Sequence, residues 1–104
     1  MGEAPRSPAR IVATDGDFEG MAYELVADET MIGRNSTADI SLLDDGMSRE
    51  HAIISYEEAS GEYVVDDLQS TNGTKVNGKR VRSAPLSPND EIRIGNTTFR
   101  FELN

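Results

Sequence analysis

The sequence predicts an all-β fold, a two-sheet antiparallel β-sandwich, and three observations support this. Short apolar runs alternate with turn-forming residues about every 8–12 positions, a spacing typical of sandwich strands. No segment places apolar residues at the 3.6-residue period of a helix. The 104 residues are enough for one domain that buries about 65% of its unfolded surface.

The strands are predicted from runs in which apolar and polar residues alternate, because neighbouring side chains of a strand point to opposite faces. The clearest case is Phe99, Phe101 and Leu103, which alternate with Arg100 and Glu102. In chain order, strands are expected at 10–13, 20–27, 30–33, 39–42, 52–57, 63–68, 91–94 and around 99–103. Residues 1–9 hold two prolines and are expected to be a flexible leader, so the domain is placed at 10–104.

Two turns have their own sequence signals. Asn77-Gly78 favours a type I′ hairpin turn, because both residues tolerate the positive φ angles that this turn requires. In the segment 87–90, Pro88 fixes one φ angle, and Asn89 can adopt the left-handed conformation.

Composition excludes several classes of site. Cysteine is absent and there is one histidine, so the chain has no disulfide and no His/Cys metal centre. No apolar stretch approaches the ~20 residues of a spanning helix, and the N-terminus lacks a signal-peptide pattern. We therefore expect a cytoplasmic monomer without membrane contact, cofactor or metal. The three Asn-x-Ser/Thr matches, at Asn35, Asn72 and Asn96, are then coincidental.

Charge is distributed unevenly along the chain. A formal net charge of −9 argues against nucleic-acid binding, which depends on neutralising phosphates with Lys and Arg. Six of the ten basic residues nevertheless lie within or beside three short motifs. They are Arg34, Arg49, Lys75, Lys79, Arg80 and Arg82. A locally basic site on an acidic body would concentrate an anionic ligand.

These three motifs predict a phosphate-binding site. They are Gly33-Arg34, the segment 48–51 (Ser-Arg-Glu-His) and the segment 70–73 (Ser-Thr-Asn-Gly), each between predicted strands. The planar guanidinium of arginine matches a pair of phosphate oxygens, and Ser, Thr and Asn offer short neutral hydrogen-bonding groups. Loops gathered at one end of a sandwich are a common binding surface. We expect Arg34, Ser48 and Asn72 to converge there.

A nucleotide-binding P-loop is disfavoured. Residues 73–79 fit G-x-x-x-x-G-K, but Arg80 stands where the motif needs Ser or Thr. The following residues run into Pro85 and do not open a helix whose N-terminus could hold phosphate.

Catalysis and metal binding are also disfavoured. Ser48 and His51 could be imagined as a nucleophile and its base, but no nucleophile-elbow pattern surrounds them. A lone histidine before an apolar strand more often fixes a loop by bonding to backbone. The pairs Asp44-Asp45 and Asp66-Asp67 lack the spacing of a calcium loop and are interpreted as solvated turn acids.

Taken together, the motifs resemble the forkhead-associated (FHA) domain, a phosphothreonine-binding β-sandwich family of about eleven strands. The matching segments are 32–34, 38–40, 48–52, 67–74, 76–78 and 90–95, in family order and spacing. Two positions depart from the family pattern. Asn89 replaces a glycine, and Met47 replaces a small β-branched residue. Neither change removes a phosphate contact.

The resemblance implies a role for each matching residue. Arg34 would pair with the phosphate, Ser48 would donate its hydroxyl to a phosphate oxygen, and Arg49 would contact phosphate or peptide backbone. Thr71 would line the phosphothreonine pocket, and Asn72 would hydrogen-bond the peptide main chain. The positions implied to shape the loops are Gly33, His51, Gly73 and Asn77.

The function implied is non-enzymatic recognition of phosphothreonine proteins or peptides in a Ser/Thr kinase pathway. The alternative is an FHA-like scaffold that docks a folded partner through a sheet face, whether or not the partner is phosphorylated. Arg34→Ala separates the two, because only the first hypothesis requires this arginine.

Overall fold

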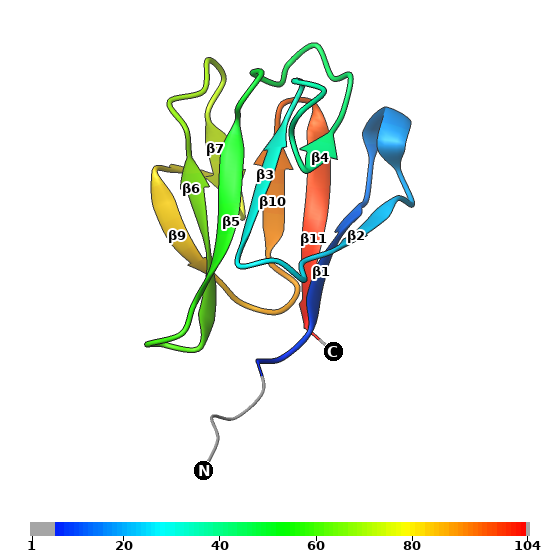
Figure 1. Cartoon of the computed structure of the whole chain (residues 1–104). Helices are drawn as coiled ribbons and strands as arrows, with labels where there is room; N and C mark the ends of the chain where they lie inside the picture. Colours follow the sequence, from blue (N-terminus) through cyan, green and yellow to red (C-terminus); the bar gives the residue numbers. More distant parts are fainter. Residues whose placement is uncertain (1–5, 104) are drawn as a thin grey trace.

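The computed structural model describes residues 6–103 and confirms the two-sheet sandwich with eleven strands (Figure 1). One sheet has the strand order β2-β1-β11-β10-β7-β8 and the other β4-β3-β5-β6-β9. Every strand pair is antiparallel except β3 with β4, which run parallel. The strands are β1 (Ala9–Ala13), β2 (Ala22–Glu24), β3 (Glu29–Gly33), β4 (Ile40–Ser41), β5 (Ala52–Glu57), β6 (Glu62–Asp67), β7 (Thr74–Val76), β8 (Lys79–Val81), β9 (Ser83–Leu86), β10 (Glu91–Ile94) and β11 (Thr97–Leu103).

The core lies between the sheets and is built by the alternation that the sequence shows. Phe99 and Phe101 on β11 are fully buried, while Arg100 between them is half-exposed. Tyr63 reaches the Phe101 ring from the opposite sheet, with centroids 5.5 Å apart. Burying each such side chain stabilises the fold by about 1.5–3 kcal/mol.

The main differences from the sequence prediction concern three elements. The strand expected over 20–27 is confined to β2, and the strand expected from residue 63 ends at Asp67. Strand β9 was not predicted, because Pro85 interrupts the signal. Its position explains why the proline is tolerated: β9 is the edge of its sheet, where a missing N–H costs no ladder bond.

Both predicted turns are confirmed. Asn77 and Gly78 have φ angles of 52° and 84°, as a type I′ turn requires, and Asn89 has a φ angle of 73°. The Asn77 amide also donates to Asp90 (3.0 Å) and accepts from the Glu91 N–H (3.0 Å), which joins the hairpin to β10.

The predicted leader is only partly covered, because residues 1–5 lie outside the described residues. Arg6 donates to the carbonyls of Leu25 (2.6 Å) and Ala27 (2.9 Å), and its guanidinium lies 4.9 Å from the Tyr56 ring centroid. Strand β1 begins at Ala9, one residue before the expected boundary. The domain limits stay a prediction.

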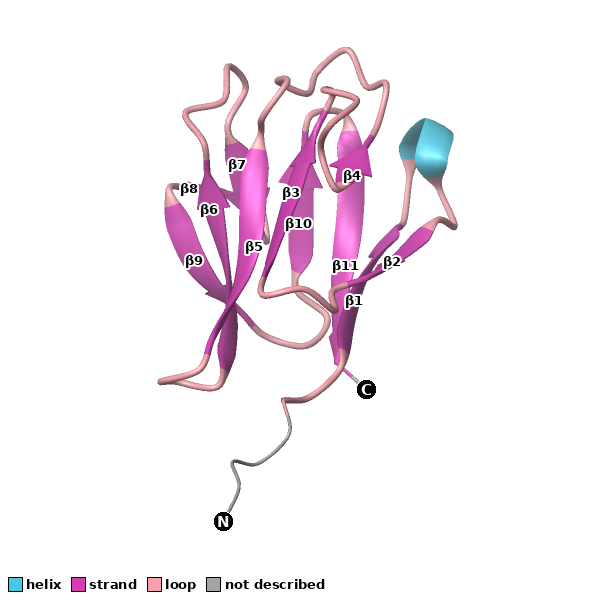
Figure 2. Ribbon diagram, in the orientation of Figure 1, coloured by secondary structure: helices cyan, strands magenta, loops and turns pink. Residues whose placement is uncertain are grey.

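Helical structure in residues 6–103 consists of the 3₁₀ turn Gly16–Phe18, coloured cyan in Figure 2. No helix in this range is long and apolar enough to cross a membrane.

Candidate functional site

Three loops gather at the end of the sandwich opposite the two chain ends (Figure 1). They are residues 34–39 after β3, residues 42–51 between β4 and β5, and residues 68–73 between β6 and β7. Together they carry every residue that the sequence predicts to contact phosphopeptide.

The second and third loops are joined by direct hydrogen bonds. The Thr71 N–H donates to the Ser48 hydroxyl oxygen (3.0 Å), and the Asn72 side-chain amide donates to the Gly46 carbonyl (2.8 Å). These bonds fix residues that lie more than 20 positions apart in the sequence at the same surface.

The first loop is attached to the second through Arg34. Its backbone N–H donates to the Ser48 carbonyl (3.0 Å), and its Nε donates to the Met47 carbonyl (3.1 Å). A side chain at Gly33 would overlap the Arg49 backbone, so this close approach of two chain segments requires glycine. The structure therefore brings Arg34, Ser48, Thr71 and Asn72 together, with Arg49 adjacent to Ser48.

These side chains retain hydrogen-bonding capacity. Within residues 6–103 the two Nη groups of Arg34 have no hydrogen-bond or ion-pair partner, and the side chain is exposed. The Ser48 oxygen accepts from Thr71, which leaves the hydroxyl proton available to a further acceptor. Arg49, Thr71 and Asn72 are exposed. Two guanidinium groups and a hydroxyl donor on one surface suit a compact anion.

His51 lies under these loops and is fully buried. Its Nδ1 accepts from the Ser48 backbone N–H (3.0 Å), so its Nε2 carries the proton and donates to the Gly73 carbonyl (2.9 Å). Both ring nitrogens are thus occupied by backbone groups. Neither is left to take a proton from the Ser48 hydroxyl, so these two residues do not form the nucleophile–base pair considered from the sequence.

The interpretation of Asp67 as a solvated turn acid is wrong. Its carboxylate accepts from the Ser70 hydroxyl (2.5 Å), the Ser70 N–H (3.1 Å) and the Thr74 hydroxyl (2.8 Å). Partial burial acts to raise the pKa of Asp67, but the hydrogen bonds from Ser70 and Thr74 outweigh it and hold this pKa below its ordinary value. Asp67 therefore stabilises the conformation of the β6–β7 loop.

Asp44 is also not solvated. It is 5% exposed and accepts from the Gly46 N–H (2.8 Å), the Asn96 N–H (3.0 Å) and the Thr97 hydroxyl (2.7 Å). The Asp-x-Gly spacing is an Asx-turn signal that could have predicted the first of these bonds. No group of three or more potential metal ligands occurs among the residues described.

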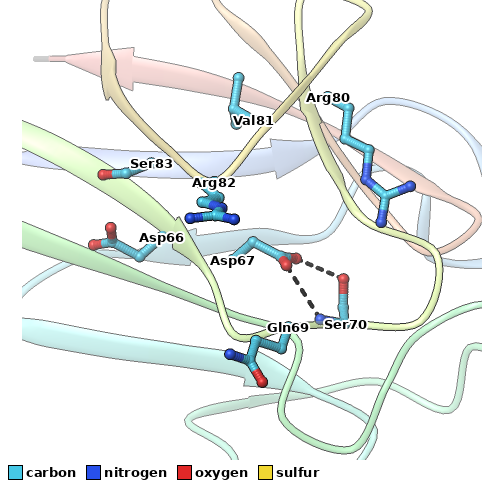
Figure 3. A pocket seen from close by; sticks show the side chains of 8 residues that line it. All are labelled: Asp66, Asp67, Gln69, Ser70, Arg80, Val81, Arg82 and Ser83. Atoms are coloured by element: carbon cyan, nitrogen blue, oxygen red, sulfur yellow. Dashed lines mark hydrogen bonds between the residues drawn. The ribbon is translucent and has the colours of Figure 1, made fainter.

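Asn77, which the resemblance implies to shape the loops, lies in the β7–β8 hairpin that the sequence predicts and bonds to Asp90 and Glu91. An open groove of about 750 Å³ lies below the β6–β7 loop, and Figure 3 shows Asp67 and Ser70 joined within it, with Arg80 and Arg82 on its wall.

Comparison with known families decides the identity of the fold. The family model described as the FHA domain matches residues 30–95, which include all three loops. The chain belongs to the FHA domain family. Its fold and loop arrangement are therefore those of this family.

Individual FHA proteins are similar over most of the chain. The transcriptional regulatory protein EmbR of Mycobacterium tuberculosis is 41% identical over 86 residues, covering 82% of this chain and 22% of EmbR. The glycogen accumulation regulator GarA of Mycolicibacterium smegmatis is 40% identical over 91 residues, covering 88% of this chain and 56% of GarA. The chain thus spans less than two thirds of either relative.

Solved FHA structures superpose closely. EmbR in complex with a low-affinity phosphopeptide has a TM-score of 0.83 and 34% identity, over 94% of this chain and 25% of EmbR. A structure from a structural and functional analysis of phosphothreonine-dependent FHA domain interactions has a TM-score of 0.82 and 33% identity. That match covers 94% of this chain and 97% of the other.

Proposed function

We propose that this FHA domain is a non-enzymatic reader that binds phosphothreonine-containing proteins or peptides in a Ser/Thr kinase pathway. The observation that carries the proposal is the set of hydrogen bonds between loops, which holds Arg34, Ser48 and Asn72 on one surface with free donor groups. The EmbR phosphopeptide complex and the phosphothreonine-dependent interactions of a similar FHA domain support it.

Each side chain has a distinct role in this proposal. The two Nη groups of Arg34 bind phosphate oxygens, and the Ser48 hydroxyl donates its remaining proton to another. Each charge-assisted bond contributes about 1.5–3 kcal/mol, enough to dominate a small peptide interface. Arg49 adds positive charge, Thr71 lines the pocket around the threonine, and Asn72 bonds to the peptide main chain.

The hydrogen bonds of His51 support the non-enzymatic part of this proposal. His51 uses both ring nitrogens on backbone groups, so Ser48 has no base and serves as a hydrogen-bond donor.

The test is an NMR titration of the labelled domain with a degenerate phosphothreonine peptide pool and with the same pool unphosphorylated. We expect shifts at Arg34, Ser48, Arg49, Thr71 and Asn72 with the phosphorylated pool alone. Arg34→Ala should reduce affinity at least tenfold and keep the amide spectrum of a folded domain. Arg100→Ala, on the outer face of β11, should bind as the unmodified domain does.

The opposite result has a clear meaning. If Arg34→Ala binds its partner with unchanged affinity, or if both pools bind equally, the phosphothreonine hypothesis is wrong. Docking through a sheet face would then be the better account.

A further inference from the structure

An apolar groove lies between β2 and β4, the edge strands of the two sheets, which both lie toward the right in Figure 1. Its volume is about 380 Å³. The apolar residues that line it are Ala22, Tyr23, Val26, Ala27 and Ile40. We call it the edge groove. The Val26 side chain is 82% exposed, so a ligand in the edge groove would remove a large apolar side chain from water.

Two carboxylates line the edge groove beside these apolar residues. They belong to Glu24 on β2 and to Asp39, which directly precedes β4, and both residues are exposed. Arg10 lies opposite Glu24 but bonds to Glu102 (2.8 Å), and within residues 6–103 neither groove carboxylate has an ion-pair partner. One Asp39 oxygen accepts from the Met31 N–H (2.8 Å), which leaves the other for a cation.

Strand β2 also has an unpaired backbone edge, because it is the outermost strand of its sheet. The Leu25 N–H donates to the Ala9 carbonyl on β1 (2.9 Å). Alternate residues of an antiparallel strand direct their backbone groups to the same side, so those of Ala22 and Glu24 point away from β1. An extended segment could pair with these groups as an additional strand.

Charge decides between the possible occupants of the edge groove. A second copy of this chain would bring a further net charge of −9 to a surface that is already acidic. Anionic lipid and nucleic acid would be repelled by Glu24 and Asp39 in the same way. A polypeptide that carries both cationic and apolar side chains complements the carboxylates, the apolar lining and the strand edge together.

We propose that the edge groove binds an extended polypeptide segment in which Lys or Arg alternates with apolar residues. The segment pairs with β2, its apolar side chains cover Tyr23 and Val26, and its cations lie near Glu24 and Asp39. Alternation places the two kinds of side chain on opposite faces of the segment. The inference goes beyond phosphothreonine recognition, because the edge groove contains none of the residues proposed to contact phosphopeptide.

The experiment uses the isotope-labelled chain and three synthetic peptides of equal length, capped at both ends. One peptide alternates Lys with Val, one alternates Lys with Ser, and one alternates Glu with Val. NMR titration at low salt gives the residues affected and the dissociation constant. We expect the Lys/Val peptide to shift the amide signals of Ala22, Glu24, Val26 and Asp39. It should bind about tenfold more tightly than the other two, and about threefold more weakly at high salt.

Two pairs of variants localise the binding. Val26→Ser should weaken binding of the Lys/Val peptide about fivefold, because it removes apolar contact area. Its control is Leu43→Ser, which changes an equally exposed side chain (83%) outside the edge groove and should have no effect. Glu24→Gln should weaken binding about twofold. Glu58→Gln removes the same charge from the exposed turn between β5 and β6 and should leave binding unchanged.

Four outcomes would overturn the inference. They are shifts confined to residues outside the edge groove, equal binding of the Lys/Val and Glu/Val peptides, an equal loss in Val26→Ser and Leu43→Ser, and displacement of the Lys/Val peptide by the phosphothreonine peptide pool. Sedimentation equilibrium provides a further test, since a dimer that Val26→Ser dissociates would show that the edge groove holds a second copy instead. All of these results leave phosphothreonine recognition to its own titration.

Discussion

At the scale of single residues, some polar groups of the site form hydrogen bonds within the domain, and others stay available to a ligand. Ser48 accepts a bond from Thr71 and keeps its proton, and Arg34 uses Nε on a carbonyl and keeps both Nη groups. His51 and Asp67 direct all their bonds inward. The sequence could predict which residues are polar and near a turn. It could not predict this division, because each bond joins distant segments.

Asp67 predicts a pH dependence of stability. Its pKa in the folded domain is below its ordinary value of 3.8, so folding favours the charged form. The resulting stabilisation is fully present above the unfolded pKa and is lost as the pH falls through the folded pKa. Asp67→Asn should therefore lower the free energy of unfolding more at pH 7 than at pH 3. Urea unfolding at the two pH values measures the difference, and an equal loss at both would contradict the assignment.

Gly33 predicts a steric effect. Because an added side chain overlaps the Arg49 backbone, Gly33→Ala should reduce the free energy of unfolding by about 1–3 kcal/mol and disturb the loop that carries Ser48. Gly61→Ala is a useful control, since its surroundings are open and only its positive φ angle of 72° is penalised. Chemical denaturation compares the two. A Gly33→Ala domain as stable as the unmodified one would show that the two segments can separate freely.

At the scale of elements, sequence signals were reliable where local chemistry decides the outcome. Asn77-Gly78 predicted its hairpin because two positive φ angles leave few alternatives. Strand β9 was not predicted, because Pro85 argues against a strand unless the strand lies at a sheet edge. Which strand lies at an edge is determined by the whole sheet. The parallel pairing of β3 with β4 likewise arises from how the chain returns after the Arg34 loop.

The hairpin also predicts a gain in stability. Lys75→Thr removes a cation that faces Arg93 and Arg80 and introduces a residue that favours strands. We expect a gain of about 0.5 kcal/mol, which raises the Tm by about 2–4 °C. Lys79→Thr, opposite Val76, lacks the charge relief and should gain less. Thermal unfolding followed by circular dichroism gives both values, and a lower Tm for Lys75→Thr would show that Lys75 is not repelled by Arg93 and Arg80.

At the scale of the whole molecule, the sequence predicted the fold class and the gathering of three loops at one end. Both follow from the order of strands and turns, which periodicity reveals. The positions of the basic residues were predicted only in part, because Lys75 and Arg80 belong to the basic cluster that the sequence shows and Arg93 does not. That Arg93, Lys75 and Arg80 lie opposite one another on β10, β7 and β8 depends on strand register, which needs the completed sheet.

The bonds between the loops have a kinetic consequence. Because the Thr71–Ser48, Asn72–Gly46 and Arg34–Met47 bonds join groups of the domain itself, the entropy of ordering these loops is lost during folding. Ligand binding then requires no closure of these loops, so the association rate is determined by the encounter of ligand and domain and by their relative orientation. Differences in affinity between ligands should therefore arise from how long each complex survives.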